Sequence, residues 1–132
     1  MAVIEWSEDL SVGVPVLDGH HQRLLELLNA LFEAIRGPNS QETVGTVLGE
    51  LADYTHYHFN EEERLLEQAN FPNLAGHIKL HRAMTAKVDH LREEYRQDPR
   101  TVYAAELFEF LSDCLVRHIK SEDATYRPTL AG

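Results

Sequence analysis

Polar side chains continue the apolar helical stripes of this sequence at regular intervals. Residues 56–81, HYHFNEEERLLEQANFPNLAGHIKLH, hold four histidines and four glutamates. Residues four apart lie on the same face of an α-helix. His58 and Glu62 are spaced in this way, and so are His77 and His81. Each pair extends a stripe of apolar residues, so any fold that buries the stripes must also bury imidazoles and a carboxylate.

The apolar periodicity predicts four helices joined by short connections. The first follows Asp18, a good N-cap residue, and ends at GPNS, residues 37–40. The second ends at NFPN, residues 70–73, the third spans about 74–97, and the fourth ends before Pro128. Helices of similar length with short connections favour an all-α, up-down-up-down four-helix bundle.

Residues 1–17 show no helical periodicity, and Gly13 and Pro15 would interrupt a helix. We therefore expect an extended N-terminal arm. Three of its apolar residues can pack onto the bundle: Trp6, Val12 and Val14. A chain of 132 residues is about one domain, so we expect a single domain over 1–132, with the bundle at 18–126.

Charge and composition exclude several classes of partner. The net charge of −10 argues against a nucleic-acid or anionic-membrane partner.

The single cysteine, Cys114, cannot form an internal disulfide, which fits a reducing compartment. The start, MAVIEWSEDL, is not a signal peptide, and no apolar run approaches the roughly 20 residues of a membrane span. We expect a cytoplasmic protein with no membrane insertion.

The stripes bring several metal-ligating side chains into the predicted interior. These residues are His21, His58, Glu62, His77, His81 and His118. Buried polar groups need partners, and an unpaired buried carboxylate is costly. A metal ion would satisfy all of these groups together, and imidazole with carboxylate suits Fe, Zn or Mn. The donors are too many for one tetrahedral zinc, so the pattern predicts a two-metal centre with a bridging carboxylate.

Spacing alone leaves two candidates for the carboxylate ligand near the end of the fourth helix. Glu122 lies four residues after His118, and Asp123 lies five after it. Ideal helix geometry therefore favours Glu122, whereas a π-bulge would bring Asp123 inward.

Several other polar residues do not have the spacing that would place them on the apolar faces. We expect His20, His56 and His90 to lie off the stripes, and Glu61 and Glu63 to be solvated. Tyr126 and Trp6 are interpreted as packing residues.

Four segments together resemble the hemerythrins, here the single-domain bacterial kind. They are WSEDLSVGVPVLDGHH (6–21), HFNEEE (58–63), HIKLH (77–81) and HIKSED (118–123). The resemblance covers the chain from Trp6 to Tyr126.

The resemblance implies a non-haem di-iron centre with an oxo or hydroxo bridge. One iron would take His77, His81 and His118, and the other His21 and His58. Glu62 and Asp123 would bridge the irons, so the resemblance chooses Asp123 over Glu122. The second iron would keep one open position, where O2 would bind. We expect this O2 pocket to be walled by apolar residues within a turn of the ligands: Leu24, Phe59 and Leu115.

The implied function is reversible O2 binding for storage, transport or delivery to an oxygen-consuming enzyme. The chain would then be a monomeric binding protein without catalytic residues. Two alternatives remain: a di-iron oxidase or peroxidase, and a sensor of O2 or iron that acts through a partner. Di-iron carboxylate enzymes use Glu-x-x-His motifs and more carboxylates than this chain offers, which favours the carrier.

Overall fold

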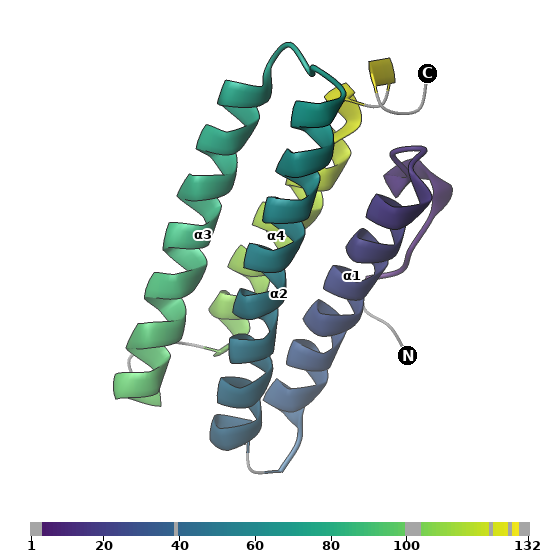
Figure 1. Ribbon diagram of the computed structural model, residues 1–132. Helices are drawn as coiled ribbons and strands as arrows, with labels where there is room; N and C mark the ends of the chain where they lie inside the picture. Colours follow the sequence, from purple (N-terminus) through teal and green to yellow (C-terminus); the bar gives the residue numbers. More distant parts are fainter. Residues whose placement is uncertain (1–3, 39, 100–103, 122, 127, 130–132) are drawn as a thin grey trace.

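Four antiparallel helices form an up-down-up-down bundle in the computed structural model, which describes residues 4–38, 40–99, 104–121, 123–126 and 128–129 (Figure 1). The helices are α1 (Pro15–Arg36), α2 (Ser40–Gln68), α3 (Leu74–Gln97) and α4 (Ala104–Ser121). Two short 3-10 helices flank them, η1 (Glu8–Leu10) and η3 (Asp123–Tyr126). No strand occurs in the described residues, so the predicted all-α bundle is confirmed.

The predicted apolar stripes form the main core. Leucines of α1 and α2 pack there with Met84, Val88 and Tyr95 of α3 and with Leu111 and Leu115 of α4. Burying a side chain of this size stabilises the fold by about 1.5–3 kcal/mol. Toward the end of α2, Leu66 is fully buried whereas Leu65 is only half-buried.

The first helix begins earlier than the sequence predicts. α1 starts at Pro15, whose fixed φ and missing N–H suit the first helical position. Asp18 is therefore not the N-cap, and this prediction is wrong. Its carboxylate instead accepts hydrogen bonds from the Val12 N–H at 2.8 Å and the Ser11 hydroxyl at 2.6 Å. Asp18 thus ties the N-terminal arm to the start of α1.

The arm packs onto the end of the bundle where α1 begins. Val12 is 1% exposed and forms a second apolar cluster with Leu17, Leu66, Phe71 and Tyr126. Gly13 turns the chain there with a φ of 76°, a conformation that favours glycine. Trp6 and Val14 also pack against the two cores, as predicted.

The end of α4 decides how Asp123 enters the bundle. The helix ends at Ser121, and Asp123 is the first residue of η3. Asp123 therefore comes from a 3-10 turn after the helix, and not from a π-bulge within it. The competing residue, Glu122, lies outside the described residues.

Alternation of helix direction gathers the predicted ligands at one end of the molecule. The starts of α1 and α3 and the ends of α2 and α4 lie together, beside the chain's C-terminal turn (Figure 1). His21 and His77 lie in the first two turns of their helices, and His58, Glu62 and His118 lie toward the ends of theirs.

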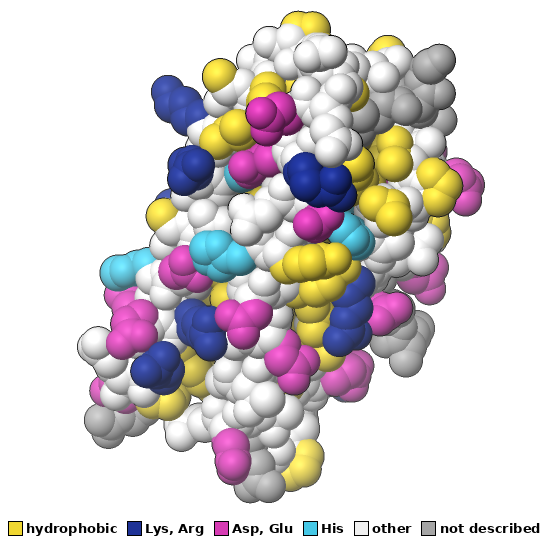
Figure 2. Space-filling model, viewed as in Figure 1, with side chains coloured by type: hydrophobic (Ala, Val, Ile, Leu, Met, Phe, Trp, Pro, Cys, Tyr) yellow, Lys and Arg dark blue, Asp and Glu magenta, His cyan; other side chains and the backbone are white. Residues whose placement is uncertain are grey.

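The surface carries charges of both signs. Acidic and basic side chains are interspersed over the face shown in Figure 2. Within the described part of the chain, no helix is long and apolar enough to cross a membrane.

Candidate metal centre

Seven polar side chains from all four helices and η3 meet inside the bundle. They are His21, His58, Glu62, His77, His81, His118 and Asp123. His118 is 6% exposed and the other six are at most 1% exposed. The donor atoms fall into two groups that share Glu62 and Asp123, and within each group they lie within 4.8 Å of one another.

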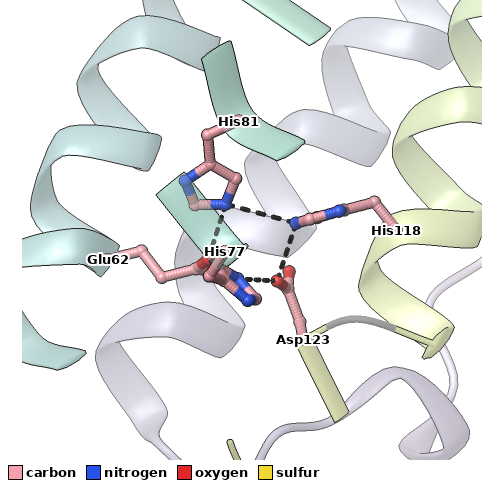
Figure 3. Close-up of side chains that lie close together, drawn as sticks. All are labelled: Glu62, His77, His81, His118 and Asp123. Carbon is pink, nitrogen blue, oxygen red and sulfur yellow. Dashed lines mark hydrogen bonds and ion pairs between the residues drawn. The ribbon is translucent and has the colours of Figure 1, made fainter. Parts of the chain in front are cut away.

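The larger group contains three histidines (Figure 3). His77 Nε2 lies 2.9 Å from Glu62 Oε1 and 2.9 Å from Asp123 Oδ1. His81 Nε2 lies 3.1 Å from Glu62 Oε1, and His118 Nε2 lies 2.9 Å from Asp123 Oδ1. The Nε2 atoms of His81 and His118 are 3.2 Å apart. Three imidazoles and one oxygen of each carboxylate therefore converge on one small volume.

The smaller group contains two histidines. His21 Nε2 lies 3.1 Å from Asp123 Oδ2 and 3.4 Å from Glu62 Oε2. His58 Nε2 lies 3.2 Å from Glu62 Oε2. Each carboxylate thus turns one oxygen toward the three-histidine group and the other toward the two-histidine group. A carboxylate placed in this way has the geometry to bridge two cations.

Unsatisfied atoms in the cluster fit a metal better than a hydrogen-bonded core. Four atoms have no hydrogen-bond partner among the described residues: His21 Nδ1, His21 Nε2, His58 Nε2 and Asp123 Oδ2. Three of them lie together on the two-histidine side: His21 Nε2 is 3.1 Å from Asp123 Oδ2, and His21 Nε2 and His58 Nε2 are 3.4 and 3.2 Å from Glu62 Oε2. Such buried polar atoms are rare and costly unless another group satisfies them. A cation ligated by His21 Nε2, His58 Nε2 and Asp123 Oδ2 would satisfy these three, and the donor set suits iron or zinc.

The charges of the cluster are strongly coupled. Burial alone would lower the pKa of His21, but the carboxylates of Asp123 and Glu62 outweigh it and raise that pKa to about 9. The same opposition raises the pKa of His77 to about 9. At His58, burial prevails and the pKa falls. Burial disfavours the charged forms of Glu62 and Asp123, yet the surrounding imidazoles hold both pKa values below their usual range. A metal ion that took these imidazoles as ligands would replace protons as the partner of the two carboxylates.

Two residues expected to lie away from the cluster contact its histidines. Glu63 was predicted to be solvated, but its carboxylate accepts a hydrogen bond from His81 Nδ1 at 2.7 Å, so that prediction is wrong. His20 falls off the apolar stripe, yet its Nδ1 lies 3.0 Å from His58 Nδ1. Helical spacing does not detect such residues, because their side chains reach sideways to a neighbouring helix.

Tyr126 was interpreted as a packing residue, but its hydroxyl also contacts a carboxylate of the cluster. It is fully buried, and its hydroxyl donates a hydrogen bond to Glu62 Oε2 at 3.0 Å. Burial and the nearby Glu62 raise the pKa of this phenol, so it remains a proton donor. A buried tyrosine hydroxyl needs a partner, which was the one available signal for this contact in the sequence.

The remaining histidines lie at the surface, as predicted. His56 is paired with Asp89 at 2.8 Å, and its side chain is 47% exposed. His90 is paired with Glu94 at 3.2 Å, and its side chain is 72% exposed. Neither belongs to the cluster.

The three predicted pocket residues all lie in the main core. Leu24, Phe59 and Leu115 are 1%, 3% and 2% exposed. The ring of Phe59 stacks on His81 with 3.8 Å between ring centroids and 3° between planes, and its centroid is 5.7 Å from that of His58. Phe59 therefore lies beside both histidine groups, with its closer contact to the larger one.

Replacing buried and exposed histidines one at a time tests whether the cluster binds metal. Replacing His77 or His81 with alanine should sharply reduce bound metal, because each removes one of three imidazoles from the larger group. Replacing His56 or His90 should leave the metal content at the wild-type value. Elemental analysis of the four purified variants checks this result, and equal losses in all four would contradict it.

The chain was compared with known protein families and proteins. Residues 12–130 match the family described as the Hemerythrin HHE cation binding domain. A bacteriohemerythrin of Stenotrophomonas maltophilia (strain R551-3) is 35% identical over 126 residues, which is 96% of this chain and 80% of that protein. A hemerythrin-like protein of Naegleria gruberi is 30% identical over 128 residues, covering 95% of this chain and 92% of the relative.

Solved structures agree on the fold. A crystal structure of wild-type hemerythrin superimposes with a TM-score of 0.91 at 24% identity, covering 99% of this chain and 100% of that one. At this identity, the likeness establishes the shared bundle.

Proposed function

The chain belongs to the hemerythrin family, and from this we propose that it binds O2 reversibly at a non-haem di-iron centre. The proposed ligands are the seven clustered residues, with His77, His81 and His118 on one iron and His21 and His58 on the other. Glu62 and Asp123 bridge the pair. The protein then stores or carries O2, or delivers it to an oxygen-consuming enzyme.

The inequality of the two donor groups is the observation that supports this proposal most directly. One group has five protein donors and the other has four, with both carboxylates shared. If two metals of the same coordination number occupied the two groups, the metal with four protein donors would have one more position open to an outside ligand. The open position would lie on the side of His21 and His58, which also holds most of the unsatisfied atoms.

The chain's own side chains provide three conditions for reversible binding. When bound there, a pair of ferrous ions supplies the electrons that allow O2 to bind. The buried imidazoles would hold the metals as neutral ligands, and among the described residues Glu62 and Asp123 supply the two carboxylates of the cluster. The buried side chains of Leu24, Phe59 and Leu115 are the proposed apolar wall of the O2 pocket, which would exclude water. Tyr126 keeps Glu62 Oε2 oriented through its hydroxyl.

We propose a carrier in preference to an oxidase or peroxidase because of the ligand set. The di-iron carboxylate enzymes hold their metals with a Glu from two helices and Glu-x-x-His motifs from two more. This cluster has five histidines and two carboxylates. Among its described polar neighbours, only Tyr126 donates an O–H toward the carboxylates, and that proton is held by Glu62.

Optical titration of the reduced protein with O2, followed by removal of O2, tests the proposal. We expect two irons per chain, a new absorption band on oxygenation, and recovery of the reduced spectrum when O2 is withdrawn. Metal analysis that finds one zinc or no metal would contradict the di-iron centre. Steady consumption of O2 with an added reductant would instead favour the oxidase.

A further inference from the structure

His81, in the larger group, contacts a carboxylate through the ring nitrogen that faces away from the cluster. Its Nε2 points into the cluster, 3.1 Å from Glu62 Oε1, while its Nδ1 points away and lies 2.7 Å from Glu63 Oε2. A metal on Nε2 would take the lone pair of that nitrogen, so the proton of the neutral imidazole would lie on Nδ1. The carboxylate of Glu63 is placed to accept that proton in a hydrogen bond.

Two contacts together fix the ring of His81. Phe59 covers one face of the ring with nearly parallel planes, 3° apart. Glu63 holds its outer edge by the hydrogen bond. The stacking fixes the plane of the ring, but it would be the same after half a turn about the Cβ–Cγ bond. The hydrogen bond from Nδ1 to Glu63 favours the state in which Nε2 faces the cluster.

Glu63 lies at the edge of the cluster, next to solvent. Its side chain is 19% exposed, and it lines a surface pocket of about 130 Å³ together with Phe59 and His81. The carboxylate therefore contacts both solvent and a buried ligand. The outer nitrogen of His58, in the smaller group, faces the imidazole of His20 instead of a carboxylate. The two halves of the centre thus have outer partners of different charge.

We propose that Glu63 is a positioning residue that holds His81 in its metal-binding orientation and increases the electron donation of its imidazole. This inference rests on the proposed metal centre and assigns a role to a residue outside the donor set. A negative charge on the outer N–H strengthens the ligand and favours the higher oxidation state of the metal. Glu63 thereby biases the three-histidine metal toward the oxidised form.

Two substitutions separate orientation from charge. Glu63→Gln keeps an oxygen that can accept the Nδ1 proton but removes the charge. It should retain nearly wild-type Fe2+ affinity and shift the midpoint potential of the centre to a more positive value. Glu63→Ala removes both, and should lower Fe2+ affinity by about 10–100-fold. Glu61→Ala is the matched control, since Glu61 lies on the same helix but pairs with Arg64 at 2.9 Å and forms no hydrogen bond or ion pair with a described histidine.

Anaerobic competition of each purified protein with a chelator for Fe2+ measures affinity, and spectroelectrochemistry measures the potential. The ¹⁵N shifts of His81 in the Zn2+-loaded protein report which ring nitrogen carries the proton. Unchanged affinity and unchanged His81 shifts in Glu63→Ala would overturn the orientation role, and an unchanged potential in Glu63→Gln would overturn the charge role. None of these measurements uses O2. A wild type that holds iron without binding O2 would contradict the proposed function, but the same measurements would still decide the role of Glu63.

Discussion

Asp123→Ala is expected to abolish the metal centre, with loss of both metals. Asp123 is fully buried and belongs to both donor groups, with Oδ1 at 2.9 Å from His77 and His118 and Oδ2 at 3.1 Å from His21. Its removal takes one ligand from each metal at once. Metal affinity should fall by more than about 100-fold, beyond the 10–100-fold typical of residues that only support a ligand. Metal analysis and the optical spectrum of the purified variant measure the loss.

Glu122→Ala is the matched control, because ideal helical spacing from His118 would have chosen that neighbour instead. It should keep both metals and the wild-type spectrum. A centre that survives Asp123→Ala and disappears in Glu122→Ala would show that the chain after Ser121 continues as a helix. Circular dichroism of both variants should show unchanged helical content, so that loss of metal is not mistaken for loss of the fold.

Leu115→Asn is expected to leave iron content intact while the oxygenated protein loses its O2-binding competence much faster. Leu115 is 2% exposed, lies in the main core and is one helical turn before His118. An amide there would attract water into an apolar wall, and water displaces the bound ligand and leaves an oxidised, inactive centre. A buried polar contact is worth about 1–3 kcal/mol. The autoxidation rate should therefore increase about tenfold or more, since ~1.4 kcal/mol corresponds to a factor of ten.

Leu115→Met is the appropriate control, because it keeps the apolar character and nearly the volume of the side chain. Its autoxidation rate should stay close to that of the wild type. Thermal melts of both variants separate local from global effects, since Leu115→Asn also loses core packing. An autoxidation rate that is unchanged in Leu115→Asn would mean that exclusion of water at this position does not protect the bound state.

Local periodicity was enough to predict the helices and most of the buried cluster. The i,i+4 spacing of His58 with Glu62 and of His77 with His81 places each pair on one face, whatever the neighbouring helices do. The apolar residues of the same stripes then require that face to point inward. This is why these four residues, and His21 and His118 on their own stripes, are buried in the structure. The third helix was predicted at 74–97 and observed at Leu74–Gln97 for the same reason.

Contacts made at the ends of helices could not be derived from periodicity. Spacing from His118 favoured Glu122, whereas α4 ends at Ser121 and a 3-10 turn presents Asp123 to the cluster. Asp18 looked like an N-cap, but Pro15 starts the helix and leaves Asp18 to bind the arm. Where a helix ends depends on the backbone that follows or precedes it, and so regular spacing no longer applies there.

The sequence by itself determined which helix faces are apolar and which imidazoles they carry inward, because both follow from the rotation per residue of a single helix. Only the tertiary structure decided how the carboxylate oxygens divide between the two histidine groups, and which outer residues hold the ligands. Glu63 reaches His81, and Tyr126 reaches Glu62, across distances set by the packing of different elements. Those contacts depend on the relative positions and side-chain reach of segments far apart in the chain, and no local repeat contains that information.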